Sequence, residues 1–250
     1  MPDWGQLDQV IDNFPNPDFP HLFQGFPEID SRYRLGYWWY CLFERHWSLR
    51  GMTNALMDYH LYPEEVHRLF AKITDFYLRI IERAADEQQC DGIWTSDDLG
   101  TQTGPFFSPQ IFREFFKPYY KKIFDRCREV GVHSWMHACG NVEPLIGDWI
   151  EIGLDVIHPI QRHAMDPLAI ERKHGGKITF FGGLDVQQVI PWGTPEEVRE
   201  EVRFLIDTYW RGGKCMITAG NMINGNCSLE SLEAFLEETM NYGKKVAARA

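Results

Sequence analysis

Residues 132–140 read VHSWMHACG, an apolar run that ends in a histidine, an alanine, a cysteine and a glycine. Alternate residues of a strand point to the same face, so His137 and Cys139 can face one site if this run is a strand. Their Cα atoms would then lie about 6.5–7 Å apart, which suits two ligands of one zinc ion. The stretch therefore predicts a strand with a metal-binding pair at its carboxyl end.

Cys227 is the third ligand candidate, because it lies in a loop that follows another apolar run at residues 215–219. One histidine and two cysteines with an open fourth position are typical of a catalytic zinc site rather than a structural one. A structural interpretation of the same residues is that the free cysteines are buried and the histidine satisfies a hydrogen bond in the core. The spacing alone leaves both interpretations open.

Short apolar runs alternate with amphipathic segments along the chain, which indicates an α/β fold with parallel strands. A Ser, Asp or Thr followed by proline marks the start of predicted helices at residues 108, 166 and 194, and a further helix is expected over residues 63–88. The predicted strands are residues 37–43, 92–96, 132–136, 155–160, 178–182 and 215–219. Both a doubly wound sheet and a (β/α)8 barrel fit this alternation. Polar residues at the carboxyl ends of the runs favour the rim of a barrel.

The length and composition indicate one soluble globular domain rather than a nucleic-acid-binding or membrane protein. The chain has 250 residues and a formal charge of −11, and 44% of its residues are hydrophobic. The negative charge and the absence of a basic tract argue against nucleic acid or anionic membrane as a partner. Six scattered cysteines without a secretory signal favour the cytoplasm. We expect residues 1–31, which are rich in proline, to form an irregular arm before one domain at 32–250.

Four segments together resemble the uroporphyrinogen decarboxylase superfamily. They are residues 43–51 (FERHWSLRG), 96–104 (SDDLGTQTG), 137–141 (HACGN) and 181–187 (FGGLDVQ). The resemblance spans most of residues 36–240 and implies a (β/α)8 barrel of the TIM type. The superfamily contains porphyrinogen decarboxylases and also zinc-dependent methyltransferases that exchange a methyl group with a corrinoid on a partner protein.

The methyltransferase branch is the one that the site residues resemble. Its zinc ligands come from an H-x-C motif and a later cysteine, which His137, Cys139 and Cys227 match. The resemblance thus implies Zn²⁺, a corrinoid (cobalamin) protein as partner, and methyl transfer such as O-demethylation. Only six strand candidates are present, so the first strands of the family barrel are missing from the pattern. The N-terminal arm or a second chain, in an oligomer or complex, is expected to complete the barrel unless the chain is truncated.

Several polar residues at strand ends are candidates for contact with the substrate. Asp97 or Asp98 is the predicted proton donor or hydrogen-bond acceptor, and only one of the two neighbours needs to face the site. Gln102, Asp185 and His158 are candidate substrate-binding residues. The structural alternatives are that the aspartates cap turns or helices, that Gln102 shapes its loop, and that His158 has only a structural role.

Tyr37 and Trp39 share one face of the first predicted strand and could line a pocket for a flat substrate such as a methoxylated aromatic ring. Packing in the core is the alternative interpretation of this pair.

Two further functions compete with methyl transfer. A porphyrinogen or other polycarboxylate decarboxylase would need cationic groups, and the available cluster is Arg32, Arg34, Arg45 and Arg50. A non-catalytic binding or assembly module that keeps zinc for stability would need a fourth protein ligand.

Overall fold

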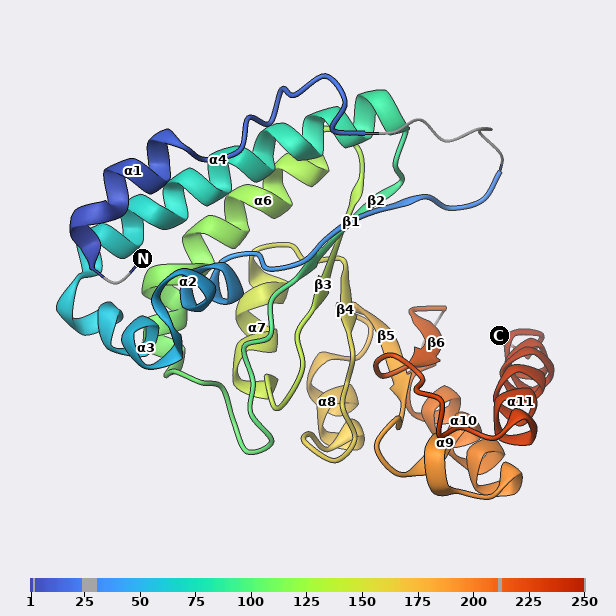
Figure 1. Cartoon of the computed structure of the whole chain (residues 1–250). Coiled ribbons are helices and arrows are strands. Elements are labelled where there is room, and N and C mark those ends of the chain that lie inside the picture. The colour runs from blue at the N-terminus through green and yellow to red at the C-terminus, as the bar shows by residue number, and fades with distance from the viewer. Residues whose placement is uncertain (2, 24–30, 211–212, 250) are drawn as a thin grey trace. The chain divides into compact units, whose positions relative to one another are not determined.

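The computed structural model describes residues 1, 3–23, 31–210 and 213–249 of the chain (Figure 1). The chain divides into two compact units, which are described separately. Unit 1 consists of Met1–Leu99, Pro105–His137 and Pro144–Asp155, and unit 2 consists of Gly100–Gly104, Ala138–Glu143 and Val156–Ala250. In the described part of the chain, no helix is both long and apolar enough to span a bilayer.

Unit 1 contains three parallel strands in chain order, and helices follow each of them. Its strands are β1 (Leu35–Trp38), β2 (Gly92–Ser96) and β3 (His133–His137). The registers place Tyr37 opposite Trp94 and Ser96 opposite His137. The helices are α1 (Leu7–Asp12), α2 (Phe43–Arg50), α3 (Met52–Leu61), α4 (Pro63–Gln88), α5 (Pro109–Ile111), α6 (Lys117–Glu129) and α7 (Glu143–Glu151), with single helical turns at Trp4–Gln6 and Phe112–Phe116.

Helix α4 shows how the sequence determines the packing of unit 1. It begins with Pro63 at the first helical position, where the missing N–H needs no partner, and ends before Gln89 in the left-handed conformation. Residues three and four apart form a buried stripe that includes Val66, Leu69 and Ile73. The neighbouring helix α6 lies alongside it, and an ion pair between Arg126 and Glu82 joins the two at 3.1 Å.

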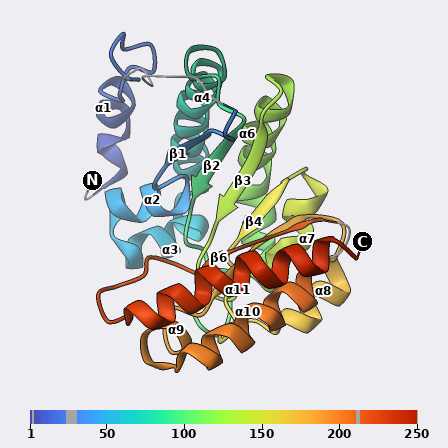
Figure 2. The ribbon, with the colours of Figure 1, turned by 90° about the vertical axis from the view of Figure 1, so that its right-hand side faces the viewer.

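Unit 2 repeats the alternation with three more parallel strands in chain order, β4 (Val156–His158), β5 (Thr179–Leu184) and β6 (Cys215–Ala219). Its helices are α8 (Pro167–His174), α9 (Val189–Trp192), α10 (Pro195–Tyr209) and α11 (Leu229–Ala247). Thr194 and Glu197 form the capping box that starts α10. Helices α10 and α11 lie side by side (Figure 2), linked by a hydrogen bond from Arg203 to Glu238 of 2.8 Å.

The alternation of parallel strands and helices confirms the predicted α/β class, and the predicted bounds hold for β2, β6 and α4. The first strand was predicted at 37–43 and is wrong at its carboxyl end, because β1 stops at Trp38 and α2 already begins at Phe43. Tyr40 has a positive φ of 59°, which breaks the extended backbone. The N-terminal arm is also less irregular than predicted, since residues 7–12 form α1.

Two loops of unit 2, residues 100–104 and 138–143, are held together by backbone contacts. The N–H of Gly100 donates to the carbonyl of Cys139 at 3.1 Å, and the N–H of Asn141 donates to the carbonyl of Thr101 at 2.7 Å. Gly140 has a φ of +83°, and a Cβ atom there would lie 2.4 Å from the carbonyl atoms of Gly100. Only glycine fits at position 140, so this close approach fixes the backbone of Cys139.

A buried charge network in unit 1 connects the first helical turn with α2 and α3. The Asp58 carboxylate accepts hydrogen bonds from Arg50 at 2.8 and 3.0 Å, from His46 at 3.2 Å and from the Trp4 indole at 3.1 Å. Burial alone would raise the pKa of Asp58, but these donors outweigh burial and hold the pKa well below its ordinary value. Burial lowers the pKa of His46, despite the opposing effect of Asp58.

The network predicts that Asp58→Asn destabilises the fold, because the buried Arg50 guanidinium loses the carboxylate charge that accepts two of its hydrogen bonds. We expect a loss of about 3 kcal/mol in the free energy of unfolding at pH 7, as for other broken buried pairs. The Asp58 pKa is depressed in the folded state, so its contribution is present above the ordinary carboxyl pKa and is lost as the pH falls through and below that value. Urea denaturation followed by circular dichroism at pH 7 and pH 3.5 measures both effects.

Asp8→Asn is the matched control, because Asp8 forms an exposed ion pair with Arg68. It should change the free energy of unfolding by less than about 1 kcal/mol at either pH. Equal losses in the two variants would contradict a stabilising role for the buried network.

The two loops predict that Gly140→Ala destabilises the chain more than Gly131→Ala. Both glycines have positive φ, but a Cβ at Gly131 (φ +79°) meets no atom within 4 Å. Gly131→Ala therefore reports the backbone strain alone, about 1–2 kcal/mol. Gly140→Ala adds the clash with Gly100, and we expect at least about 1 kcal/mol more. Thermal and urea denaturation of the two variants compare these costs, and equal losses would mean that the loops separate without penalty.

Candidate metal centre

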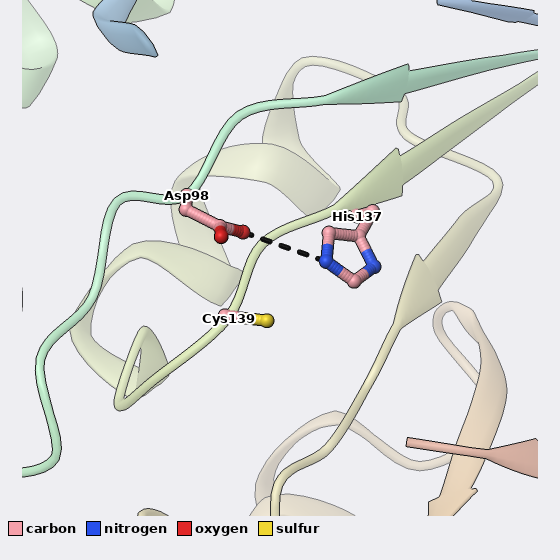
Figure 3. Close-up of side chains that lie close together, drawn as sticks. All are labelled: Asp98, His137 and Cys139. Carbon is pink, nitrogen blue, oxygen red and sulfur yellow. Dashed lines mark ion pairs between the residues drawn. The ribbon is translucent and has the colours of Figure 1, made fainter. Parts of the chain in front are cut away.

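Three potential metal ligands converge where β3 ends (Figure 3). The ligand atoms of Asp98, His137 and Cys139 all lie within 4.8 Å of one another. His137 is the last residue of β3, Cys139 follows it by two residues, and Asp98 follows β2 by two residues. The His137 Nε2 atom lies 3.4 Å from the Asp98 Oδ1 atom. The predicted pair of His137 and Cys139 is therefore brought together, with a carboxylate beside it.

The surroundings of His137 favour a neutral imidazole. Its side chain is only 7% exposed, and its ring packs against Trp94 at 6.2 Å and Trp39 at 6.3 Å between ring centroids. Burial lowers the pKa of His137, although the Asp98 charge acts in the opposite direction. The neutral ring is the form that binds a metal ion, and the two tryptophans restrict its orientation.

The adjacent residues Asp97 and Asp98 have different environments. The Asp97 carboxylate is fully buried, and it accepts the backbone N–H groups of Leu42, Phe43 and Glu44 and the Tyr120 hydroxyl. Burial raises the pKa of Asp97 to about 6 against the lowering effect of these donors. Asp97 thus caps the start of α2, which agrees with the structural interpretation that these aspartates cap turns or helices. The Asp98 side chain is 42% exposed and belongs to the metal-ligand cluster.

Cys227 lies outside this cluster. It is partly exposed in the loop between β6 and α11, and its thiol donates to the backbone carbonyl of Ser228 at 3.2 Å. The structure thus places Asp98, rather than Cys227, beside the His137 and Cys139 ligand atoms.

A pocket of about 270 Å³ in unit 2 opens at Cys139, and amide side chains line much of it. The Asn221 Nδ2 atom donates to the Cys139 sulfur at 3.5 Å. Gln161 accepts the backbone N–H of Gly140 at 2.8 Å and also lines the pocket. Asn221 belongs to the polar residues at strand ends that favour a barrel rim, but neither amide was predicted to be a site residue. The available signal was their position, since each lies within two residues of the end of a predicted strand.

Asp185 lines the same pocket but also has a capping role. Its carboxylate accepts the backbone N–H groups of Gln187, Gln188 and Val189 at 2.9–3.0 Å, and His163 lies 3.2 Å away. Burial would raise the pKa of Asp185, but these donors hold it below its ordinary value. Asp185 therefore starts α9 and stays ionised at the pocket wall.

The other residues predicted to bind the substrate lie in different parts of the structure. His158 ends β4, and its Nε2 atom lies 3.2 Å from the carbonyl oxygen of Ala219. Gln102 is exposed in the loop 100–104. Tyr37 and Trp39 are both exposed and meet edge to face at 4.9 Å, so the structure does not bury them in a core.

Comparison with known proteins adds a family and a fold. The family model described as uroporphyrinogen decarboxylase (URO-D) matches residues 47–242. A methylated-thiol–coenzyme M methyltransferase of Methanosarcina mazei is 21% identical over 75% of this chain and 48% of its own length. The methylcobamide:CoM methyltransferase MtbA of the same organism is 27% identical over 53% of this chain and 37% of its own length. The chain thus spans half or less of these relatives.

A solved structure described as a methyltransferase from Methanosarcina mazei has a TM-score of 0.65 and 17% identity, with 79% of this chain and 56% of that chain covered. This similarity, together with the alternating parallel strands and helices, confirms the predicted TIM-barrel-like α/β fold. The described residues contribute six strands to it. Because the family model covers most of the sequence, the chain belongs to the uroporphyrinogen decarboxylase (URO-D) family.

Proposed function

We propose that this protein transfers a methyl group between a small substrate and a corrinoid cofactor carried by a partner protein, at a zinc site. The observation that carries the proposal is the convergence of His137 and Cys139 at the end of β3, with Asp98 beside them. The curated relatives are methyltransferases, and one of them is named for methylcobamide. These names support the reaction class, while the substrate and the zinc are our proposal.

The donor set fits zinc. Imidazole nitrogen and thiolate sulfur are preferred ligands of Zn²⁺, with bonds of about 2.0–2.3 Å, and atoms within 4.8 Å of one another can share one ion. We propose Cys227 as the third ligand. It belongs to the same loop as Asn221, which already bonds the Cys139 sulfur, so this loop can deliver Cys227 to the ion. The fourth position then stays open for the substrate.

Bound zinc would supply Lewis acidity, which stabilises a thiolate or alkoxide form of the substrate at neutral pH. The protein supplies orientation and charge. Trp94 and Trp39 hold the His137 ring, Asn221 donates to the Cys139 sulfur, and the two interlocked glycine loops fix the Cys139 backbone. Asp98 is the proposed proton donor or hydrogen-bond acceptor, because it is the exposed member of the aspartate pair.

The pocket beside Cys139 is the proposed substrate site. Asp185 and the amides of Gln161 and Asn221 line it, and they can orient polar groups of a small molecule. We propose that Gln102 and His158 act at the rim of the same site. A methoxylated aromatic ring is one candidate substrate, because Tyr37 and Trp39 offer exposed ring faces.

The decarboxylase alternative receives less support from the structure. Its arginine cluster does not converge, since Arg50 is buried against Asp58 and the Arg45 guanidinium lies over the Tyr40 ring at 5.6 Å. A polycarboxylate needs several cationic groups that point to one site. The family contains decarboxylases, but Arg45 and Arg50 have other partners.

We predict that Cys139→Ser and Cys227→Ser each remove zinc and methyl transfer together. The wild-type chain should bind about one zinc per chain, and each variant should lose most of it, because two remaining ligands hold Zn²⁺ weakly. Plasma mass spectrometry measures the metal. Anaerobic assays with reduced free cobalamin as the acceptor follow the absorbance of methylcobalamin, and we expect at least a 100-fold lower rate in both variants.

Cys215→Ser is the matched control, because Cys215 starts β6 and belongs neither to the metal-ligand cluster nor to the loop that carries Cys227. It should keep both zinc and activity, and circular dichroism should confirm that all three variants are folded. Unchanged zinc content and turnover in Cys139→Ser and Cys227→Ser would overturn the proposed metal site.

A further inference from the structure

Helix α11 exposes a row of large apolar side chains along one of its faces. Leu229, Leu236 and Met240 are 66%, 54% and 55% exposed. Their spacing of seven and four residues places them on one side of the helix, and we define these three residues as the α11 stripe. Single exposed apolar residues are common on protein surfaces, but a continuous row of large ones is typical of an interface.

The other face of α11 is occupied by α10, which lies alongside it (Figure 2). Glu237 at the border of this face pairs with Arg199 of α10 at 3.3 Å. The buried residues of α11 are Ser231, Ala234 and Phe235. Helix α10 therefore does not cover the α11 stripe, and the stripe has room for a different partner.

The N-terminal arm has its own contacts in unit 1. Asp8 pairs with Arg68, and Arg83 donates to the backbone carbonyl of Phe19 at 3.0 Å. Both arginines belong to α4. These contacts hold the described part of the arm on α4, so this part of the arm is not the partner of the α11 stripe.

Two oppositely charged residues border the α11 stripe. Glu233 lies four residues after Leu229 and three before Leu236, and Lys244 lies four residues after Met240, so both are neighbours of the stripe on the helix surface. Both are exposed, and neither has an ion-pair partner within the part of the chain that the structure describes. The surface is thus acidic near the start of α11 and basic near its end. Such a pattern is complementary to itself when two copies run in opposite directions.

We propose that two copies of this chain associate through the α11 stripe, with the two helices antiparallel about a twofold axis. In this register Leu236 of one copy meets Met240 of the other, and Glu233 meets Lys244, each contact occurring twice by symmetry. A parallel arrangement would bring Glu233 to Glu233 and Lys244 to Lys244, and like charges repel. The charges therefore favour the antiparallel arrangement. The association does not depend on the proposed methyl transfer.

The size of the interface determines how strong this association is. Helix α11 has 19 residues, and its length is therefore about 28 Å. A single pair of helices of this length buries less than the roughly 1,200 Å² of a standard stable interface. We therefore expect a reversible dimer with a dissociation constant on the order of 10–100 μM.

Sedimentation velocity of the purified chain under reducing conditions and at low salt tests the proposal. Over a range of about 5 to 300 μM, the weight-average sedimentation coefficient should rise from the monomer value to the dimer value. A chain that stays monomeric over the whole range would overturn the proposal and would mean that a different protein covers the α11 stripe.

Leu236→Glu locates the interface on α11. It should raise the dissociation constant at least about 10-fold, because the dimer would bury two carboxylates without partners. Leu236 is 54% exposed, so the fold should tolerate the change, which circular dichroism checks. Leu168→Glu is the matched control, since Leu168 is 48% exposed on α8 and lies outside the α11 stripe. Equal association of folded Leu236→Glu and wild type would contradict the proposal.

A charge exchange tests the antiparallel register. Glu233→Lys alone should raise the dissociation constant about 5-fold, because it places two lysines together at both symmetric contacts. The double variant Glu233→Lys with Lys244→Glu should return it to within about 2-fold of wild type, since opposite charges meet again. The two residues are eleven positions apart, or about 16 Å along one helix, so contact within one copy cannot produce this rescue. A double variant that associates no better than Glu233→Lys would overturn the antiparallel arrangement.

Discussion

The close approach of two backbone segments at Gly100 and Gly140 is the constraint on which the candidate site depends. No side chain fits at either position without meeting the other segment, and Gly140 has a positive φ that favours glycine. Hydrogen bonds from Gly100 to Cys139 and from Asn141 to Thr101 then lock the loops. These contacts fix the backbone of Cys139, which lies two residues after the last residue of β3.

A second constraint gives the adjacent residues Asp97 and Asp98 different environments. Neighbouring residues in extended chain point in opposite directions, so Asp97 and Asp98 cannot share one environment. Asp97 is buried and receives donors from the start of α2, which secures that helix against the strand end. Asp98 is left partly exposed beside His137. The structural interpretation of this pair therefore describes Asp97, while the chemical role of Asp98 stays a proposal.

Local signals in the sequence predicted most of the elements. The proline after a capping residue located the start of α10, and the apolar stripe gave α4 its full length. The first strand was misplaced, because its end depends on the backbone of Tyr40 and on hydrogen bonds from α2 to Asp97, which lies 57 residues away from Tyr40 in the sequence. Long-range contacts of this kind leave no local pattern.

In the candidate site, too, local sequence signals predicted some contacts, and long-range contacts left no local pattern. The H-x-C spacing was sufficient to pair His137 with Cys139, because both residues belong to one continuous segment. The position of Asp98 beside them depends on the register between β2 and β3, and the bond from Asn221 to Cys139 depends on how the β6 loop folds back. A ligand contributed by a loop, as proposed for Cys227, is the least predictable part for this reason.

X-ray absorption spectroscopy at the zinc edge of the zinc-loaded chain identifies the ligands of the proposed metal site. If His137, Cys139 and Cys227 are the ligands, we expect a shell with two sulfur atoms at about 2.3 Å and one imidazole nitrogen at about 2.0 Å, completed by one light atom. A shell with a single sulfur and a carboxylate oxygen would contradict it, because Asp98 would then hold the position assigned to Cys227.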